Sequence, residues 1–253
     1  MDCKWNNLEI VSFLGSGFFS DVYRIRLDGN DYTIKRFKTS IDDITDEDYL
    51  RDLRRKKKKK ERTDEEITQI IAKQAEEKSQ HEVKMLLKVR GKDTTGTGVY
   101  DTVPHVAQIV DFIDANGSPA IIFEYFEGVG LGDYKFKNFE ELLTFLINLV
   151  GTIDLLNSMG IAHGDLGYPN RNNILYNERT GDYSIIDFGQ AEEKQGVMER
   201  HIIEDTVSSP ASRLLNKHPK FRSLEKLVTN TGPRKGNVYD PDLREKLINL
   251  LNS

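Results

Sequence analysis

The sequence predicts an α+β fold in two parts, the first built on five antiparallel strands and one long helix, the second smaller and mainly helical. Three observations lead to this expectation. Strand-like apolar runs with turn signals fill much of residues 1–126, one long helical pattern interrupts them, and from Asn138 apolar residues recur at helical spacing. We therefore expect domains at 1–126 and 127–253, with a basic insertion at about 40–62 in the first.

The strands are predicted from apolar runs separated by turns. Residues 8–37 read LEIVSFLGSGFFSDVYRIRLDGNDYTIKRF, which indicates three strands divided by a Gly-rich turn and by an Asp-Gly turn. Two more strands are expected at 107–113 and 120–126. The dipeptide Asn116-Gly117 lies between them, and this dipeptide is typical of a tight hairpin.

Two long helices are predicted from capping signals and apolar periodicity. The first covers about 63–89 and begins with a Thr-x-x-Glu capping box. The second begins after an Asn-x-x-Glu box at Asn138 and Glu141 and ends at Gly160, a residue that often follows the last helical turn.

Composition excludes several classes of protein. Hydrophobic residues make up 38% and charged residues 30%, and the net charge of -5 gives no global attraction to nucleic acid or anionic membrane. The only cysteine is Cys3, so neither an intrachain disulfide nor a paired-cysteine zinc site is expected. The most apolar stretch, 142–156, contains several polar residues, so no membrane span is expected. We expect a cytoplasmic protein, with a nuclear location or delivery into a host cell as open alternatives.

The most informative stretches are HGDLGYPNRNNILY at 163–176 and DFG at 187–189. They contain a lone Asp, a cluster of amides and a second Asp, each beside strand-like residues. Two short strands are expected around a Thr-Gly turn between these stretches. That arrangement would set Asn173 and Asp187 close together at neighbouring strand ends.

Five motifs in this order resemble the protein-kinase-like fold, over roughly residues 8–195. Each motif is weak alone, but together and in the matching strand, helix and loop contexts they are specific. The resemblance implies a bilobal fold with a five-stranded N-lobe and a reduced, mainly helical C-lobe. It also implies an ATP-dependent phosphotransferase that uses ATP and Mg²⁺.

By this resemblance, one set of residues would bind the nucleotide. The two glycines of GSGFFSDV would let the backbone pass close over a triphosphate, and the valine would lie against adenine. The stretch AIIFEYF resembles the linker between lobes, with one Phe at the gatekeeper position and backbone groups that face the base. The residues in question are Gly15, Gly17, Val22, Phe123, Glu124 and Phe126. A simple hairpin turn and a plain buried strand are the alternatives.

Lys35 in the third strand would hold the α- and β-phosphates, and Glu82 in the long helix would pair with it. The alternatives are an exposed strand lysine and a solvated glutamate that pairs with Lys78. Glu76 or Glu77 would then be the partner of Lys35.

Asp165 is the candidate catalytic base, which would accept or orient the proton of an attacking hydroxyl. Asp187 would bind Mg²⁺, and an amide would complete the metal site, because Mg²⁺ demands hard oxygen ligands. The family's usual count points to Asn170, whereas Asn173 directly precedes a strand and fits the count back from Asp187. We therefore interpret Asn173 as the ligand, with Asn170 as the alternative.

Several positions depart from the family pattern. Gly164 replaces the arginine that commonly pairs with an activation-loop phosphate, so that control is not expected. Gly167 replaces a lysine typical of serine/threonine kinases, and no Ala-Pro-Glu follows DFG. His163 is expected to be structural and to pack beneath Phe188. These features resemble compact atypical kinases, including the RIO kinases, the small kinase of the tRNA-modifying KEOPS complex and minimal bacterial effector kinases.

The function expected from these motifs is a protein kinase, with serine or threonine as the favoured acceptor and its protein substrate unknown. A small-molecule kinase of the aminoglycoside or choline type and a pseudokinase that binds without turnover are the alternatives. The hydroxyl residues of Thr206–Ser212 are expected to lie in an exposed loop, with autophosphorylation as the alternative.

A basic run lies between Lys35 and Glu82. Nine of the twelve residues from Arg51 to Arg62 are basic. Such a block is usually solvated or disordered, which is our first interpretation. The alternatives are a nuclear-localisation or nucleic-acid patch, whose affinity would fall steeply with salt, and a docking site for an acidic protein.

Overall fold

A computed structural model of the chain describes residues 8–55, 61–90, 103–167, 171–194, 201–209, 212, 215–229 and 242–253. The chain divides into two compact units. The first, Met1–Leu87 with Ala107–Phe126, is called the sheet unit below. The second, Lys88–Val106 with Glu127–Ser253, is called the helical unit.

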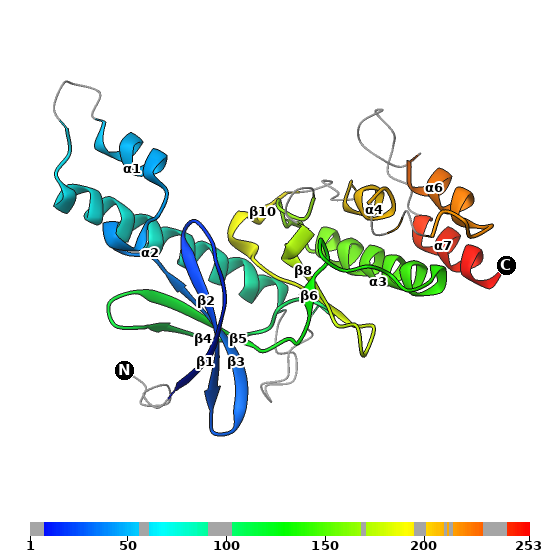
Figure 1. The fold of residues 1–253 in the computed structure, drawn as a ribbon, viewed down its shortest axis with the longest axis horizontal. Coiled ribbons are helices and arrows are strands. Elements are labelled where there is room, and N and C mark those ends of the chain that lie inside the picture. The colour runs from blue at the N-terminus through cyan, green and yellow to red at the C-terminus, as the bar shows by residue number, and fades with distance from the viewer. Residues whose placement is uncertain are drawn as a thin grey trace. The chain divides into compact units, whose positions relative to one another are not determined.

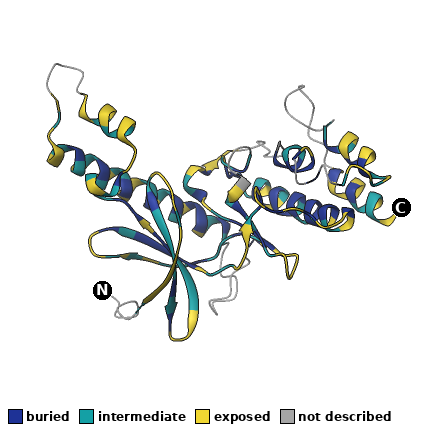
Figure 2. Cartoon of the chain, in the orientation of Figure 1, coloured by how far each residue is buried: buried dark blue, intermediate teal, exposed yellow. Residues whose placement is uncertain are grey.

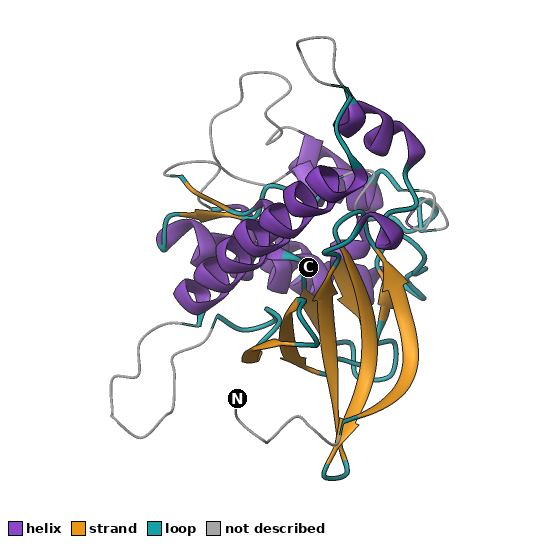
Figure 3. Ribbon diagram, turned by 90° about the vertical axis from the view of Figure 1, so that its left-hand side faces the viewer, coloured by secondary structure: helices purple, strands orange, loops and turns teal. Residues whose placement is uncertain are grey.

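The sheet unit contains an antiparallel sheet (Figure 3). Its strand order is β1-β2-β3-β5-β4. Its strands are β1 (Glu9–Ser16), β2 (Ser20–Leu27), β3 (Asn30–Phe37), β4 (Ile109–Asp114) and β5 (Pro119–Glu124). Alternate residues of the three central strands form a buried cluster on one face, which contains Ile25, Leu27, Ile34, Ala120 and Ile122. The five predicted strands are therefore confirmed.

Both predicted hairpin turns of the sheet unit have two central residues with left-handed backbone. Asn116 and Gly117 have φ angles of 57° and 83°, and Asp28 and Gly29 have φ angles of 51° and 78°. This conformation is what a two-residue turn requires when it follows the twist of its strands. The Asn-Gly and Asp-Gly dipeptides therefore fix the β4–β5 and β2–β3 registers.

Helix α2 (Asp64–Val89) starts at the predicted capping box. The Thr63 N–H donates to Glu66 Oε2 (2.9 Å), and the Glu66 N–H donates to Thr63 Oγ1 (3.2 Å). Two of the helix's unpaired N-terminal N–H groups are thus satisfied reciprocally.

Helix α1 (Glu47–Arg54) was not predicted from the sequence. It follows the 3-10 helix η2 (Ile41–Asp43) and lies beside α2 (Figure 1). Three partly buried residues, Tyr49, Leu50 and Leu53, pack on a cluster whose members are Ile44, Ile67 and Ile71. This packing, rather than local propensity, explains why a highly charged segment forms a helix.

The helical unit is built around α3 (Phe139–Ser158). The other helices among its described residues are α4 (His201–Val207), α6 (Phe221–Thr229) and α7 (Leu243–Asn252). Its short strands and 3-10 helices are β6 (Val129–Gly130), β7 (Ile161–Ala162), η3 (Arg171–Asn173), β8 (Ile174–Tyr176), β9 (Tyr183–Ile185), η4 (Phe188–Gln190) and β10 (Glu192–Glu193). They form a β6-β8-β9 sheet and a β10-β7 pair, and α7 packs on α3.

Helix α3 is buried along most of its length, whereas α1 is exposed or half-buried (Figure 2). Asn138 Oδ1 accepts from the Glu141 N–H (2.8 Å), as predicted. The Glu141 carboxylate differs from the prediction, because it accepts from the Lys137 N–H (2.6 Å) and from two tyrosine hydroxyls. Two partly buried hydroxyls need this acceptor, so the carboxylate turns toward them.

In the parts of the chain that the structure describes, no helix combines the length and the apolar character needed to cross a bilayer. The Asn-x-x-Glu start of α3 and the Gly160 stop, at φ 68°, agree with the predicted limits of this most apolar helix.

The capping box gives a first testable prediction. Thr63→Ala removes one hydrogen-bond partner of the α2 N-terminus and should lower the free energy of unfolding by about 1 kcal/mol. Urea titration followed by circular dichroism measures the loss. The control is Lys73→Ala in the same helix, which removes an exposed ion pair with Glu77 and should cost less than about 0.5 kcal/mol. Equal losses in the two variants would show that the box contributes nothing.

Candidate active site

The sheet unit holds a buried ion pair between β3 and α2. Lys35 Nζ lies 2.7 Å from Glu82 Oε2 and 3.0 Å from Oε1. The Lys35 and Glu82 side chains are 11% and 1% exposed. The predicted pair is therefore confirmed. The alternative partners have other contacts: Glu77 lies near Lys73, Glu76 accepts from Gln80, and Lys78 lies over the Phe19 ring. Breaking such a pair would leave one charge buried without compensation.

Three predicted nucleotide residues form a row across the sheet. Gly15 on β1 is opposite Val22 on β2, and Val22 is opposite Lys35 on β3. Directly opposed residues share one face of a sheet, so all three lie on the same face. A Cβ added at Gly15 would meet no atom within 4 Å. The chain itself therefore does not demand glycine there, which agrees with space kept for a ligand.

The linker residues end the sheet unit. Phe123 is buried on β5 between Thr33 and Ile109, as a gatekeeper would be. Glu124 is exposed, and its backbone N–H already donates to Gln108 O (3.0 Å). Phe126, the last residue of the sheet unit, is half-buried. That the backbone of Glu124 and Phe126 contacts a base stays a prediction.

In the helical unit, β7 leads to His163, which is fully buried. Its Nε2 donates to the Ile186 carbonyl (2.9 Å), and its ring meets the Phe188 ring edge-on, with centroids 4.6 Å apart. The predicted structural role of His163 is confirmed. This histidine ties the segment before Asp165 to the segment around DFG.

Gly164 has a physical reason to replace the family's arginine. Its φ is +83°, a left-handed conformation that side chains disfavour. A Cβ at this position would lie 2.5 Å from Gln190 O, a backbone atom that has no freedom to move aside. The His-Gly-Asp motif is therefore set by the close approach of the two segments.

Asp165 and Asn173 are in direct contact. Asn173 Nδ2 donates to the Asp165 carbonyl (2.8 Å) and to Asp165 Oδ2 (3.0 Å). The Ile186 N–H donates to Asn173 O (2.9 Å), which places Asn173 beside the strand end that leads to Asp187. This geometry favours Asn173 over Asn170, and Asn170 lies outside the described residues. With its Nδ2 directed at Asp165, Asn173 has Oδ1 to offer a cation.

Asp187 has an uncommon backbone conformation, with φ 62° and ψ 73°. Its side chain is exposed, and its Oδ1 accepts from the Gly189 N–H (3.3 Å). A left-handed aspartate costs on the order of 1 kcal/mol and is found where surrounding structure holds it. The carboxylate of Asp187 and the amide oxygen of Asn173 are hard oxygen donors, so the pair fits Mg²⁺.

Asn172 is a site residue that sequence reasoning missed. Its Oδ1 accepts from the Gly132 N–H (3.2 Å) and lies where a Cβ of Gly130 would be. Asn172 thus fixes η3, and with it Asn173, against the turn after β6. The sequence shows two adjacent asparagines, Asn172 and Asn173, and this pairing could have indicated that one of them has a structural role.

Two tyrosines share the Glu141 carboxylate, and one of them, Tyr176, lies on β8, the strand that follows Asn173. The hydroxyls of Tyr134 and Tyr176 donate to Glu141 Oε1 at 2.7 and 3.1 Å. Burial raises the pKa of both tyrosines well above the usual value, and the nearby Glu141 charge raises it further. Both therefore stay neutral donors, and β8 is held on α3.

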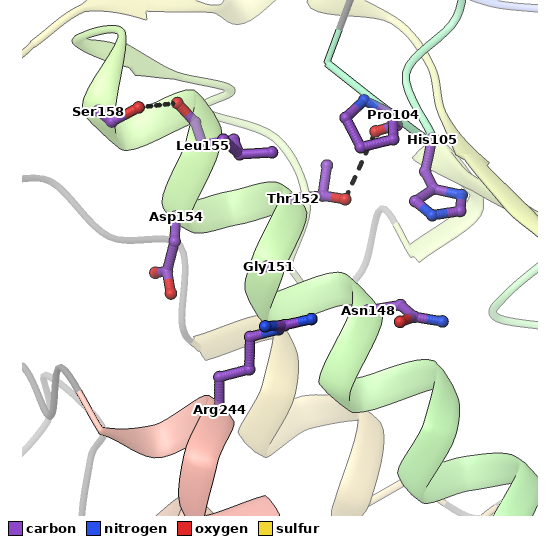
Figure 4. Close-up of a pocket in the computed structure, with 9 residues that line it drawn as sticks. All are labelled: Pro104, His105, Asn148, Gly151, Thr152, Asp154, Leu155, Ser158 and Arg244. Atoms are coloured by element: carbon purple, nitrogen blue, oxygen red, sulfur yellow. Dashed lines mark hydrogen bonds between the residues drawn. The ribbon is translucent and has the colours of Figure 1, made fainter. Parts of the chain in front are cut away.

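A pocket lies elsewhere in the helical unit, along α3 (Figure 4). Its lining includes His105, Asn148, Asp154 and, from α7, Arg244. Arg244 lies against Gly151, where a Cβ would come within 3.2 Å of its Nε. None of the residues predicted from the sequence to be functional lines this pocket, so the candidate site is defined by the motif residues.

The Thr206–Ser212 interpretation as an exposed loop is wrong for the hydroxyls of Thr206, Ser209 and Ser212, which are buried. Thr206 Oγ1 donates to Ile202 O within α4, and Ser212 Oγ donates to Thr206 O, each at 2.7 Å. These hydroxyls satisfy the end of the helix. Ser208 is exposed.

Of the described arginines of the basic run, Arg51 and Arg55 have exposed side chains, 62% and 72% exposed, as expected, whereas Arg62 is half-buried and its side chain donates to the Leu53 carbonyl. The two exposed arginines also pair with carboxylates: Arg51 with Asp48, and Arg55 with Asp52 at 3.7 Å. The local positive charge on and beside α1 is therefore smaller than the number of basic residues in the sequence indicates. Lys56–Lys60 lie outside the described residues.

The strand order, the long helix beside the sheet and the motif residues define a protein-kinase-like fold. The model of the RIO domain matches residues 21–209, well over half of the chain. The chain therefore belongs to the RIO family, whose members are atypical, protein-kinase-like proteins. A search of curated proteins found no match. Membership of this family indicates that the chain is a kinase-like enzyme that uses ATP.

Gly164 gives the second testable prediction, with Gly160 as a matched control. Both glycines have a left-handed backbone, but a Cβ at Gly160 would meet nothing within 4 Å. Gly160→Ala should cost about 1–2 kcal/mol of stability from backbone strain. Gly164→Ala should cost about 1–3 kcal/mol more, because it adds a collision with the Gln190 backbone. Thermal unfolding measures both, and equal losses would contradict the close approach described above.

Proposed function

We propose that this chain is a protein kinase that uses Mg²⁺ and transfers the γ-phosphoryl group of ATP to a serine or threonine hydroxyl of a protein. Membership of the RIO family supports the kinase-like class. The observation that carries the finer proposal is the hydrogen-bonded pair of Asp165 and Asn173, beside the strand end that leads to Asp187.

The sheet unit supplies the cation for phosphates. Lys35 is held by Glu82 in one position, so its ammonium need not be ordered when a nucleotide binds. Gly15 and Val22 share its face of the sheet. In this proposal Lys35 contacts the α- and β-phosphates, and Val22 contacts the base.

The helical unit supplies the groups for the transfer. Asp165 accepts the hydroxyl proton while the hydroxyl oxygen forms a bond to the γ-phosphorus. The bond from phosphorus to the bridging oxygen breaks, and its electron pair leaves with ADP. Asn173 holds the Asp165 carboxylate by its amide, and Asp187 and the Asn173 Oδ1 would hold Mg²⁺. When bound, this ion would neutralise charge on the phosphate oxygens.

The chain between the linker and the catalytic segment favours a protein acceptor over a small molecule. Residues 127–162 are all described, and α3 is the one long helix in this range. Small-molecule kinases of the aminoglycoside and choline types usually build a large helical substrate pocket here. Gly164 further supports activity without an activation-loop phosphate, because it stands where the arginine that commonly binds such a phosphate would be.

The basic run from Arg51 to Arg62 stays a prediction as a contact for nucleic acid or for an acidic protein. Three described arginines already pair with carboxylates, so such a contact would depend mainly on the five lysines between them and Arg62. Binding through these lysines should weaken steeply between low and moderate salt.

The third testable prediction concerns the transfer itself. Radiolabelled ATP and Mg²⁺ are offered to the chain with generic protein acceptors and, separately, with aminoglycosides and choline. We expect label on serine or threonine of protein, and a loss of at least about 100-fold in Asp165→Ala, the usual scale for a missing catalytic base. Asp133→Ala, an exposed aspartate of the same unit, is the control and should keep wild-type activity.

Three results would contradict this proposal. Label on a small molecule would place the chain among small-molecule kinases. ATP binding without transfer to any acceptor or to the chain itself would indicate a pseudokinase. Undiminished transfer by Asp165→Ala would show that another group accepts the proton.

A further inference from the structure

Lys38 is a buried lysine that the sequence did not single out. It directly follows β3, and its backbone N–H donates to Phe19 O (2.9 Å). This bond extends the β2–β3 ladder into Gly15–Val22, the segment GSGFFSDV, which is called the glycine loop below. Its side chain is 5% exposed. Lysine is almost never buried to this degree unless polar partners surround its ammonium.

The partners of Lys38 all belong to the glycine loop. Its Nζ donates to Ser16 Oγ (3.0 Å) and to the Gly17 carbonyl (2.9 Å), and it lies 3.5 Å from Asp21 Oδ1. Ser16 Oγ in turn donates to Asp21 Oδ1 (2.6 Å). The Gly17 N–H donates to Ser20 O (2.7 Å). One buried cation thus joins both ends of the turn between β1 and β2.

This network lies on the face of the sheet opposite to the nucleotide residues. Asp21 is opposite Ser16 on β1, whereas its neighbour Val22 is opposite Gly15 and Lys35. Successive side chains of a strand point to opposite faces, so Asp21 and Val22 face apart. Lys38 therefore acts through the loop and does not share the face of Lys35.

The energetic consequence is an ordered loop. A glycine-containing turn has many accessible backbone conformations, and fixing them costs entropy when a ligand binds. Three contacts to one ammonium remove much of this freedom beforehand, because a loop that moved away would leave a buried charge without its polar partners. A loop ordered in advance binds its ligand more tightly.

We propose that Lys38 is a positioning residue for ATP. It holds the glycine loop from the face of the sheet opposite to Lys35, so that the loop backbone is already ordered when the phosphates bind. This inference rests on the proposed function. The ligand class is a nucleoside triphosphate. Lys38 should contribute to the share of the binding affinity that comes from the phosphates.

A merely structural lysine would stabilise the fold without favouring phosphates, so the test separates the two roles by ligand. Calorimetric titration gives the Kd of ATP and of adenosine for the full chain and for Lys38→Met and Ser16→Ala. Asp31→Ala is the matched control, because it removes ion pairs with Arg24 and Arg26 elsewhere on the β2–β3 hairpin. Thermal unfolding records the stability of every variant.

In both loop variants, the ratio of ATP affinity to adenosine affinity should fall about tenfold, the scale of one hydrogen bond to a charged group. The control should leave the ratio unchanged even where stability falls. Ser16 is exposed, so Ser16→Ala keeps the test decisive if Lys38→Met does not fold.

Two results overturn the proposal in distinguishable ways. A wild type that binds ATP, with an unchanged ratio in the loop variants, would leave the proposed function intact and make Lys38 a structural residue. A wild type that binds no ATP would overturn the proposed function together with this inference.

Discussion

The helical unit depends on the close approach of two segments, His163–Asp165 and Ile186–Gln190. His163 donates to the Ile186 carbonyl and packs on Phe188, and the backbone at 164 passes so near Gln190 O that no Cβ fits. Asn173 joins both segments, since its amide contacts Asp165 and its carbonyl accepts from Ile186. An aspartate with a left-handed backbone is held at the end of this arrangement.

The sheet unit depends instead on two buried ammonium groups. Lys35 lies on β3 and Lys38 directly follows it, and the two side chains point to opposite faces of the sheet. Lys35 is held by a carboxylate from α2, and Lys38 by polar atoms of the glycine loop. A buried charge is costly unless its partners are in place, so each lysine specifies the position of what surrounds it. The units divide the chemistry: the sheet unit offers fixed cations, and the helical unit offers carboxylates and an amide.

Local signals made much of this fold predictable. The Asn-Gly and Asp-Gly turns, the capping boxes and the strand patterns are short-range features, and they specified five strands and two long helices. Lys35 and Glu82 are 47 residues apart in the sequence, so no local signal joins them, and the pair was predicted from motif resemblance. Asn173 was chosen because it precedes a strand, and its contact with Asp165 agrees with that choice.

The remainder depends on tertiary packing that the letters do not show. Helix α1 was not predicted because its sequence is highly charged, and its three apolar residues are buried only by packing against other elements, chiefly α2. A lysine at a strand end is normally exposed, so nothing marked Lys38 as buried. Thr206 and Ser212 looked like loop hydroxyls because the extent of α4 was not predictable. For Gly164, the sequence showed the departure, but the neighbouring carbonyl that requires it comes from a segment more than twenty residues away.

Whether Asp187 and Asn173 hold the metal of a bound nucleotide is tested most directly with Mn²⁺ in place of Mg²⁺. Electron paramagnetic resonance measures free Mn²⁺ in a titration of the chain with and without ATP. Asp187→Asn keeps a residue that tolerates a left-handed backbone, so the fold should be preserved. We expect ATP-dependent Mn²⁺ binding by the wild type that weakens about tenfold or more in Asp187→Asn. Equal binding by the two proteins would contradict this expectation.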